Sequence, residues 1–236
     1  MQRSMEYIRA LYQEFGIDMG YLQQKINYPG MIYGEAAYLL SRLIAHPDMR
    51  RFMEAGAGMS TLIYAQVAKQ YNKFFVSFED KEVWADKYNE VLRSMPELVG
   101  DFQIIRTESD PNRCPKFTEK FDLAWIDGNL AWHPDKGFPH DCCHRPGSVR
   151  YYKEALSDAL IIFDDGEDLN CRINIDTVMR EMGRDPDSCF IWNPYDRMDR
   201  NQWICPPPGG CSMLSVLDEV ANKFKTAGPV FLNMVR

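Results

Sequence analysis

The chain has 236 residues, of which 45% are hydrophobic and 26% are charged, and its formal net charge at neutral pH is −7. Such a chain can bury a core without a disulfide framework. Its acidic balance gives no basic footprint for nucleic acid, and no apolar run approaches the roughly 20 residues that a membrane-spanning helix needs.

The cysteines and the amino terminus bear on the cellular compartment. Seven cysteines are an odd number without framework spacing, and the N-terminal stretch MQRSMEYIRALYQEFG carries charges where a secretory signal would be apolar. We therefore expect a reduced, cytoplasmic protein. We expect a small-molecule partner rather than nucleic acid or a membrane, and a homo-oligomer stays open.

In chain order, helical periodicity comes first. Apolar residues recur at helical spacing over 8–15 and again over 34–46, GEAAYLLSRLIAH, which predicts two amphipathic helices. Short apolar runs follow at 51–54, 74–78, 102–105, 123–126 and 160–163, separated mostly by helical segments such as TLIYAQVAKQ and VWADKYNEVLRSM. This alternation indicates a mostly parallel sheet with helices on both faces, an α/β fold.

The C-terminal part has a different pattern. The runs CFIWNPY and QWICPPP flank the polar DRMDRN and predict an antiparallel hairpin, and SMLSVLDEVANKF predicts a last helix. No repeat or linker marks a second domain. We expect one domain over 1–236, with an N-terminal helical cover over 1–47 and a core over 48–236.

Ligands of open parallel sheets bind beyond the carboxyl ends of the strands, so we examined these ends for chemistry. After the first strand, Gly56 and Gly58 allow a tight turn, and Ser60 and Thr61 stand where a helix begins and can cap it. The spacing lacks the third glycine of the dinucleotide fingerprint. A plain strand-to-helix turn is the alternative.

Acidic residues end the neighbouring strands. Glu54 ends the first strand, and the second ends in Glu79-Asp80, where a carboxylate can accept both hydroxyls of a ribose. The third ends in Thr107-Glu108-Ser109, where a carboxylate could receive an adenine amino group. Each acid taken singly reads as a solvated loop residue, but Glu54, Glu79 and Glu108 together line one edge of the sheet.

Five segments occur in an order and spacing that resemble a known family. They are GEAAYLLSRLIA, Glu54-x-Gly56-x-Gly58-x-Ser60-Thr61, Glu79, FDLAWIDG and ALIIFDDG, between residues of about 33 and 170. They resemble the class I S-adenosylmethionine-dependent methyltransferases, in particular the small-molecule O-methyltransferase branch, whose sheet is Rossmann-like.

The resemblance implies a site for S-adenosylmethionine. Gly56 and Gly58 would pass close to its methionine part, Glu79 would hold the ribose hydroxyls, and Glu108 with Ser109 would lie near the adenine. The residues expected around the cofactor are Glu54, Gly56, Gly58, Ser60, Thr61, Glu79, Asp80, Glu108, Ser109 and Asp127.

The resemblance also implies a metal. In catechol-type members the acids that match Asp127, Asp164 and Asp165 hold Mg²⁺, and three carboxylates suit Mg²⁺ or another divalent cation. The fifth-strand pair is Asp-Asp here instead of Asp-Asn, and Leu130 stands where that type has a lysine base. The alternative is that Asp127 and Asp165 orient the cofactor or cap helices.

The stretch after Asp127 holds the candidate base. Besides Asp127 itself, His133 is the nearest catalytic candidate, with an ordinary pKa near 6.5 that suits proton abstraction, although it also reads as a loop histidine. His140, Cys142, Cys143 and His144 lack the spacing of a structural zinc site. We expect this insertion, with Pro134, Gly137, Pro139, Pro146 and Gly147, to be a lid.

The predicted reaction is attack of an acceptor oxygen on the sulfonium methyl group. The acceptor is open among a sugar, a phenol, a natural product and a nitrogen atom. A nicotinamide-dependent oxidoreductase and a non-catalytic cofactor-binding module are the alternatives.

Overall fold

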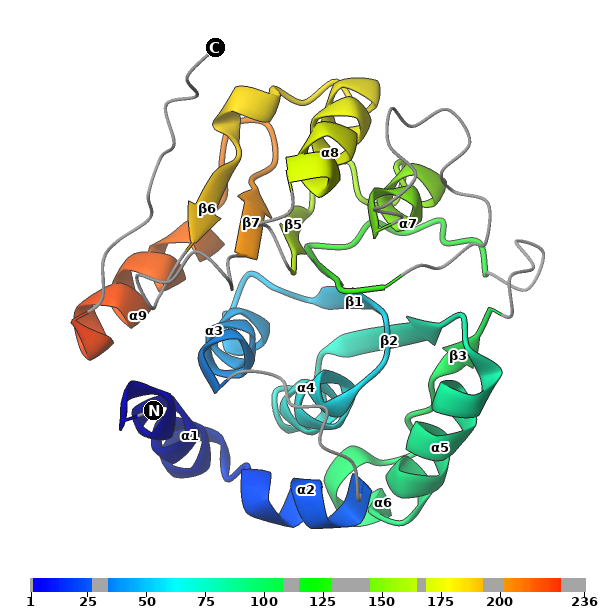
Figure 1. Cartoon of the computed structure of the whole chain (residues 1–236), viewed down its shortest axis with the longest axis vertical. Coiled ribbons are helices and arrows are strands. Elements are labelled where there is room, and N and C mark those ends of the chain that lie inside the picture. The colour runs from blue at the N-terminus through cyan, green and yellow to red at the C-terminus, as the bar shows by residue number, and fades with distance from the viewer. Residues whose placement is uncertain are drawn as a thin grey trace.

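A seven-stranded sheet forms the centre of the computed structural model, which describes residues 2–26, 34–107, 115–128, 145–164, 169–192 and 202–225 (Figure 1). Its strand order is β3-β2-β1-β4-β5-β7-β6. Strands β1 to β5 are parallel, and β7 runs antiparallel to both β5 and β6. The predicted mostly parallel sheet with a terminal antiparallel hairpin is confirmed. The strands are β1 (Arg51–Ala55), β2 (Phe74–Glu79), β3 (Ile105–Arg106), β4 (Leu123–Ile126), β5 (Leu160–Phe163), β6 (Phe190–Trp192) and β7 (Gln202–Cys205).

Helices cover both faces of this sheet. Side chains of β1 alternate between two apolar cores, with Phe52 on one side and Met53 on the other. Because both faces are covered, β4 and β5 are apolar throughout, and β1 and β2 are mostly apolar. The core around Phe52 contains α1 (Gln2–Phe15), α2 (Met19–Ile26), α3 (Gly34–Ala45), α4 (Met59–Gln70), α5 (Glu82–Arg93), α6 (Pro96–Val99) and α9 (Ser215–Phe224). The core around Met53 contains α7 (Arg145–Tyr151) and α8 (Leu169–Glu181).

The structure differs from the sequence prediction at one additional helix and at the end of the predicted lid. The sequence predicts two helices before β1, and the structure adds α2, whose buried Met19, Leu22 and Ile26 face the core. Asp18 begins this helix, because its Oδ1 accepts a hydrogen bond from Tyr21 N at 3.0 Å. The predicted lid includes Pro146 and Gly147, and this is wrong for those two residues because they lie in the first turn of α7.

The third strand begins later than predicted. Residues 102–104 of the predicted run lie outside β3, which starts at Ile105. Asn89 of α5 takes both backbone groups of Ile104: Asn89 Oδ1 accepts from Ile104 N at 2.7 Å, and Asn89 Nδ2 donates to Ile104 O at 3.1 Å. Phe102 stacks on Phe75 with ring centroids 4.6 Å apart. A helix side chain therefore replaces ladder hydrogen bonds here.

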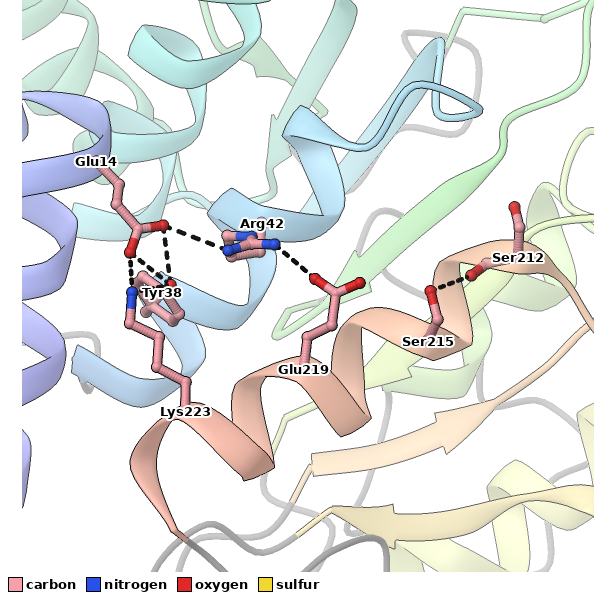
Figure 2. A network of polar contacts seen from close by, with 7 residues as sticks. All are labelled: Glu14, Tyr38, Arg42, Ser212, Ser215, Glu219 and Lys223. Carbon is pink, nitrogen blue, oxygen red and sulfur yellow. Dashed lines mark hydrogen bonds and ion pairs between the residues drawn. The ribbon is translucent and has the colours of Figure 1, made fainter.

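A polar network joins α1, α3 and α9 (Figure 2). Tyr38 Oη donates to the Glu14 carboxylate at 2.9 Å, and Lys223 Nζ contacts the same carboxylate. Arg42 pairs with Glu14 at 3.4 Å and with Glu219 at 2.6 Å. Burial raises the pKa of Glu14, but the hydrogen bonds from Lys223 and Tyr38 outweigh it and bring the pKa below its ordinary value. The network ties the first helix to the last.

None of the helices within the described ranges is long and apolar enough to cross a membrane. The single domain over 1–236, with its boundary near residue 48, stays a prediction.

Candidate functional site

The chain order reverses beside β1, whose neighbours are β2 and β4. In open parallel sheets such a point leaves a crevice at the carboxyl ends of the strands, where ligands bind. The described residues among those predicted from the sequence lie at or just after the ends of β1, β2, β4 and β5, at this edge.

The turn after β1 is held against the end of β4. Gly56 has φ +93°, in the left-handed region, and its N donates to Phe78 O at 2.9 Å. A Cβ on Gly56 would lie 2.6 Å from Gly128 N. The two glycine backbones are therefore in contact where the strand order reverses, between the ends of β1 and β4. Gly58 differs, because its backbone is extended at φ −164° and a Cβ there would meet only Ser60 Oγ, at 3.7 Å. The fold therefore requires glycine at position 56. At Gly58 there is space for a side chain, so the turn is open on the side of Gly58.

Glu54 lies beneath this turn, fully buried. Its carboxylate accepts hydrogen bonds from the hydroxyls of Ser60, Thr61 and Ser77, each at 2.6 Å. Burial raises the pKa of Glu54 to about 7, and the three hydroxyl donors only partly oppose this shift. These groups hold the start of α4 onto β1 and β2.

The predicted helix caps are only partly observed. Gly58 occupies the N-cap of α4, and Thr61 Oγ1 accepts from Gly58 N at 3.0 Å. Ser60 does not cap the helix, since its hydroxyl donates to Glu54. The sequence could not distinguish these uses, because a hydroxyl at a helix start can serve either the backbone or a neighbouring acid.

Glu79 ends β2 at the same edge and is also buried. Its Oε2 accepts from Ala57 N at 3.0 Å, and its Oε1 accepts from Lys81 N at 2.9 Å. Burial, together with neighbouring Asp80, raises the pKa of Glu79 to about 7, against the backbone donors. The carboxylate is thus fixed beside the glycine turn, and a carboxylate has about four lone-pair positions, so two backbone donors leave acceptor capacity.

Asp127 and Asp164 follow β4 and β5, and Arg145 lies between their main chains. Arg145 Nη2 pairs with Asp127 Oδ1 at 3.0 Å, while Nε donates to Asp127 O at 3.0 Å. Arg145 Nη1 donates to Asp164 O at 2.9 Å. On the other side, Gln202 Nε2 of β7 donates to Asp164 Oδ1 at 3.1 Å. The ends of three strands and one helix meet here.

These contacts engage two of the three acids predicted to hold a divalent cation. Within the described part of the chain, no three His, Cys, Asp or Glu side chains gather in a way that could hold a metal ion. Asp127 already pairs with a guanidinium that stays charged at all accessible pH, and Asp164 accepts from an amide. The metal site stays a prediction, because its third acid, Asp165, lies outside the described residues.

Other predicted residues also lie outside the described ranges. They are Glu108, Ser109, Leu130, His133 and the rest of the predicted lid up to residue 144, with the disfavoured zinc residues His140, Cys142, Cys143 and His144.

Sequence reasoning missed Arg145, Gln202, Ser77 and Gly128. One signal was available, since Pro146 favours the first turn of a helix and would have placed Arg145 at a helix start. Gln202 opens an otherwise apolar strand, which is a weaker signal.

Comparison with protein-family models and with curated proteins finds no match. Solved structures are similar in fold. Cofactor-bound Rv0187 from MTB has a TM-score of 0.56 at 14% identity, over 82% of this chain and 92% of its own. The Bacillus cereus O-methyltransferase in complex with SAH has a TM-score of 0.55 at 14% identity, over 84% and 96%. TomG, an O-methyltransferase from Streptomyces achromogenes in complex with SAM, has a TM-score of 0.50 at 16% identity, over 86% and 90%.

The chain therefore has a Rossmann-like fold similar to that of these solved structures: a mostly parallel sheet, an antiparallel hairpin at its end, and helices on both faces.

Proposed function

We propose that this protein transfers a methyl group from S-adenosylmethionine to a small-molecule acceptor, at a hydroxyl oxygen. The observation that carries the proposal is Glu79, a buried carboxylate held 3.0 Å from Ala57 N of the glycine turn, at the carboxyl end of β2. A carboxylate at this position accepts ribose hydroxyls in nucleoside-binding sheets. Support also comes from the similar solved structures, two of which are named as complexes with SAM or SAH.

In this proposal each part of the edge has a role. Glu79, which Asp80 follows at the end of β2, accepts the two ribose hydroxyls. The methionine part of the cofactor lies along the open side of the turn at Gly58, and Glu108 with Ser109 borders the adenine. Glu54, Ser60 and Thr61 stabilise the turn from beneath. The hydroxyls of Ser60 and Thr61 donate to the Glu54 carboxylate, which supports this role. Asp127 lies at the adjoining strand end and borders the acceptor.

The reaction is an in-line displacement. An acceptor oxygen forms a bond to the methyl carbon while the carbon–sulfur bond breaks, and the bonding electrons return to sulfur, which becomes a neutral thioether. The acceptor proton leaves to a base, for which we propose His133. Because positive charge disappears from sulfur, the protein's main contribution is alignment and exclusion of water. The divalent ion predicted at Asp127, Asp164 and Asp165 has no step in this reaction.

Calorimetry with the demethylated product SAH tests the cofactor. We expect saturable binding to the wild type and at least tenfold weaker binding to Glu79→Ala, about 1.4 kcal/mol, because the variant loses the acceptor for the ribose hydroxyls. Glu97→Ala is the matched control, since Glu97 is an exposed acid on α6, and its SAH affinity should equal that of the wild type. Denaturation of both variants separates folding from binding.

The alternatives give different results in the same assay. Binding of NAD with no binding of SAH would reassign the chain to the oxidoreductases. Binding of SAH without methyl transfer to any of a panel of alcohols, phenols, sugars and amines would favour a non-catalytic cofactor-binding module. Equal SAH affinity in wild type and Glu79→Ala would remove Glu79 from the site.

A further inference from the structure

An arginine lies between the two strand ends that carry the predicted metal ligands. The Arg145 side chain is 22% exposed and spans from β4 to β5, with hydrogen bonds of 2.9 to 3.0 Å to the carbonyls that follow both strands and an ion pair to Asp127. A single guanidinium thus connects the two strand ends whose acids would hold a divalent ion.

We propose that Arg145 is a built-in cation that takes the place of the divalent ion predicted from the sequence, and that it positions Asp127 and the two strand ends for methyl transfer. The inference rests on the proposed function, and it makes Arg145 a positioning residue of a metal-independent site.

The position of Arg145 is set by its surroundings. It is the first residue of α7, and one turn later Ser148 Oγ donates to Gly128 O at 3.0 Å. The first turn of α7 is therefore attached to the end of β4 at both Asp127 and Gly128. Gly128 in turn touches Gly56. The guanidinium is tied to the same backbone that forms the cofactor turn.

The charge balance favours the arginine over an added ion. A divalent ion bound to Asp127 would stand beside a guanidinium that already pairs with that carboxylate and does not lose its proton. The two cations would repel one another, and the guanidinium already pairs with one of the two carboxylate oxygens of Asp127. At β5, Gln202 Nε2 donates to Asp164 Oδ1, which is a second competing donor.

This arrangement also bears on the acceptor. A magnesium site selects acceptors with two adjacent oxygens, because both bind the ion. A site whose charge comes from a fixed guanidinium has no such requirement. In this proposal the acceptor therefore needs no chelating diol.

The first test uses the wild-type protein and Mn²⁺. After treatment with a chelator, electron paramagnetic resonance should detect no saturable binding of Mn²⁺, and melting temperature should not rise with Mn²⁺ or Mg²⁺. SAH affinity should stay within twofold before and after chelation. Saturable Mn²⁺ binding that Asp127→Asn abolishes would overturn the proposal.

The second test removes the guanidinium of Arg145. Arg145→Met should lower the melting temperature and should acquire Mn²⁺-dependent stabilisation that the wild type lacks, and the additional change Asp127→Asn should remove that gain. Low concentrations of guanidinium ion should restore part of the lost melting temperature. Arg150→Met is the matched control, because Arg150 lies on the same helix and pairs with Glu181, away from these strand ends. It should acquire no response to Mn²⁺ or guanidinium.

Should Arg145→Met fail to fold, Arg145→Lys keeps the charge but loses the planar fork, and the wild-type Mn²⁺ titration decides by itself. If Arg145→Met folds and neither Mn²⁺ nor guanidinium raises its melting temperature, the proposal that Arg145 takes the place of a divalent ion is wrong. Failure of SAH to bind any of these proteins would contradict the proposed function instead, whatever the Mn²⁺ results are.

Discussion

Gly56 is a residue at which the fold tolerates no side chain. Its φ of +93° lies in the left-handed region, and a Cβ would lie 2.6 Å from Gly128 N. The backbone conformation by itself costs an L-residue about 1–2 kcal/mol, and the contact with Gly128 forces the two loops apart in addition. We expect Gly56→Ala to lose clearly more than 2 kcal/mol of unfolding free energy, about the upper limit of that backbone cost, and to lose measurable SAH binding.

Gly183 provides the control for this prediction. It has a similar φ of +70°, but a Cβ there would meet nothing within 4 Å. Gly183→Ala should lose about 1–2 kcal/mol in urea denaturation and keep its SAH affinity, since only backbone strain is added. Equal losses of unfolding free energy in the two variants would mean that the loops at Gly56 and Gly128 move apart at little energetic cost.

Glu54 gives a pH dependence of stability. Its pKa rises from an ordinary 4.5 to about 7 in the folded chain because of burial. The folded state therefore holds this proton more tightly than the unfolded state does, and the resulting stabilisation, fully present below pH 4.5, is lost as the pH rises through about 7. The full effect is on the order of 3 kcal/mol.

The test is denaturation of wild type and Glu54→Gln at a series of pH values. Because Gln does not titrate, the difference in unfolding free energy between the two proteins should shift in favour of the variant as the pH rises from 5 to 8, by roughly 2–3 kcal/mol. Glu79 titrates in the same range but is present in both proteins, so it cancels in the difference. A difference that is independent of pH would show that Glu54 ionises normally.

At the scale of elements, the network around Glu14 fastens α1 to the rest of the fold (Figure 2). Glu14→Ala removes the carboxylate that the Tyr38 hydroxyl, Arg42 and Lys223 all contact. We expect a loss of about 1–3 kcal/mol and faster hydrogen exchange confined to α1.

Lys120→Ala is the control for that loss, because Lys120 and Asp158 form an ion pair whose side chains are 56% and 66% exposed. Exposed pairs contribute about 0–1 kcal/mol. Hydrogen exchange in α1 that is unchanged by Glu14→Ala would indicate that apolar packing of the helix suffices.

Elements with a strong local pattern could be predicted from the sequence, and weakly patterned ones could not. Strands β1, β2, β4 and β5 are runs of buried apolar residues, and their positions are confirmed within one residue. The start of β3 was wrong, because Asn89, 15 residues earlier in the chain, takes the backbone groups of Ile104. Helix α2 was missed because it has only eight residues.

For the whole molecule, the strand order decides which ends share an edge. Residues 56 and 128 are distant in sequence, yet they touch because β1 pairs with β4, and Glu79 joins them because β2 pairs with β1 on the other side. The parallel direction of these strands places all their carboxyl ends together, which is why a single cofactor can reach residues from three segments.

The sequence by itself determined the alternation of strands and helices, the need for glycine after the first strand and the acid that ends the second. Each of these depends on the local period of apolar residues or on the chemistry of a turn, which neighbours along the chain already specify. Only the tertiary structure decided that Glu54 is buried against three hydroxyls and that Arg145 lies between the ends of β4 and β5. Burial and ion pairing depend on which distant segments meet, and a carboxylate that binds a metal looks the same in sequence as one that binds an arginine.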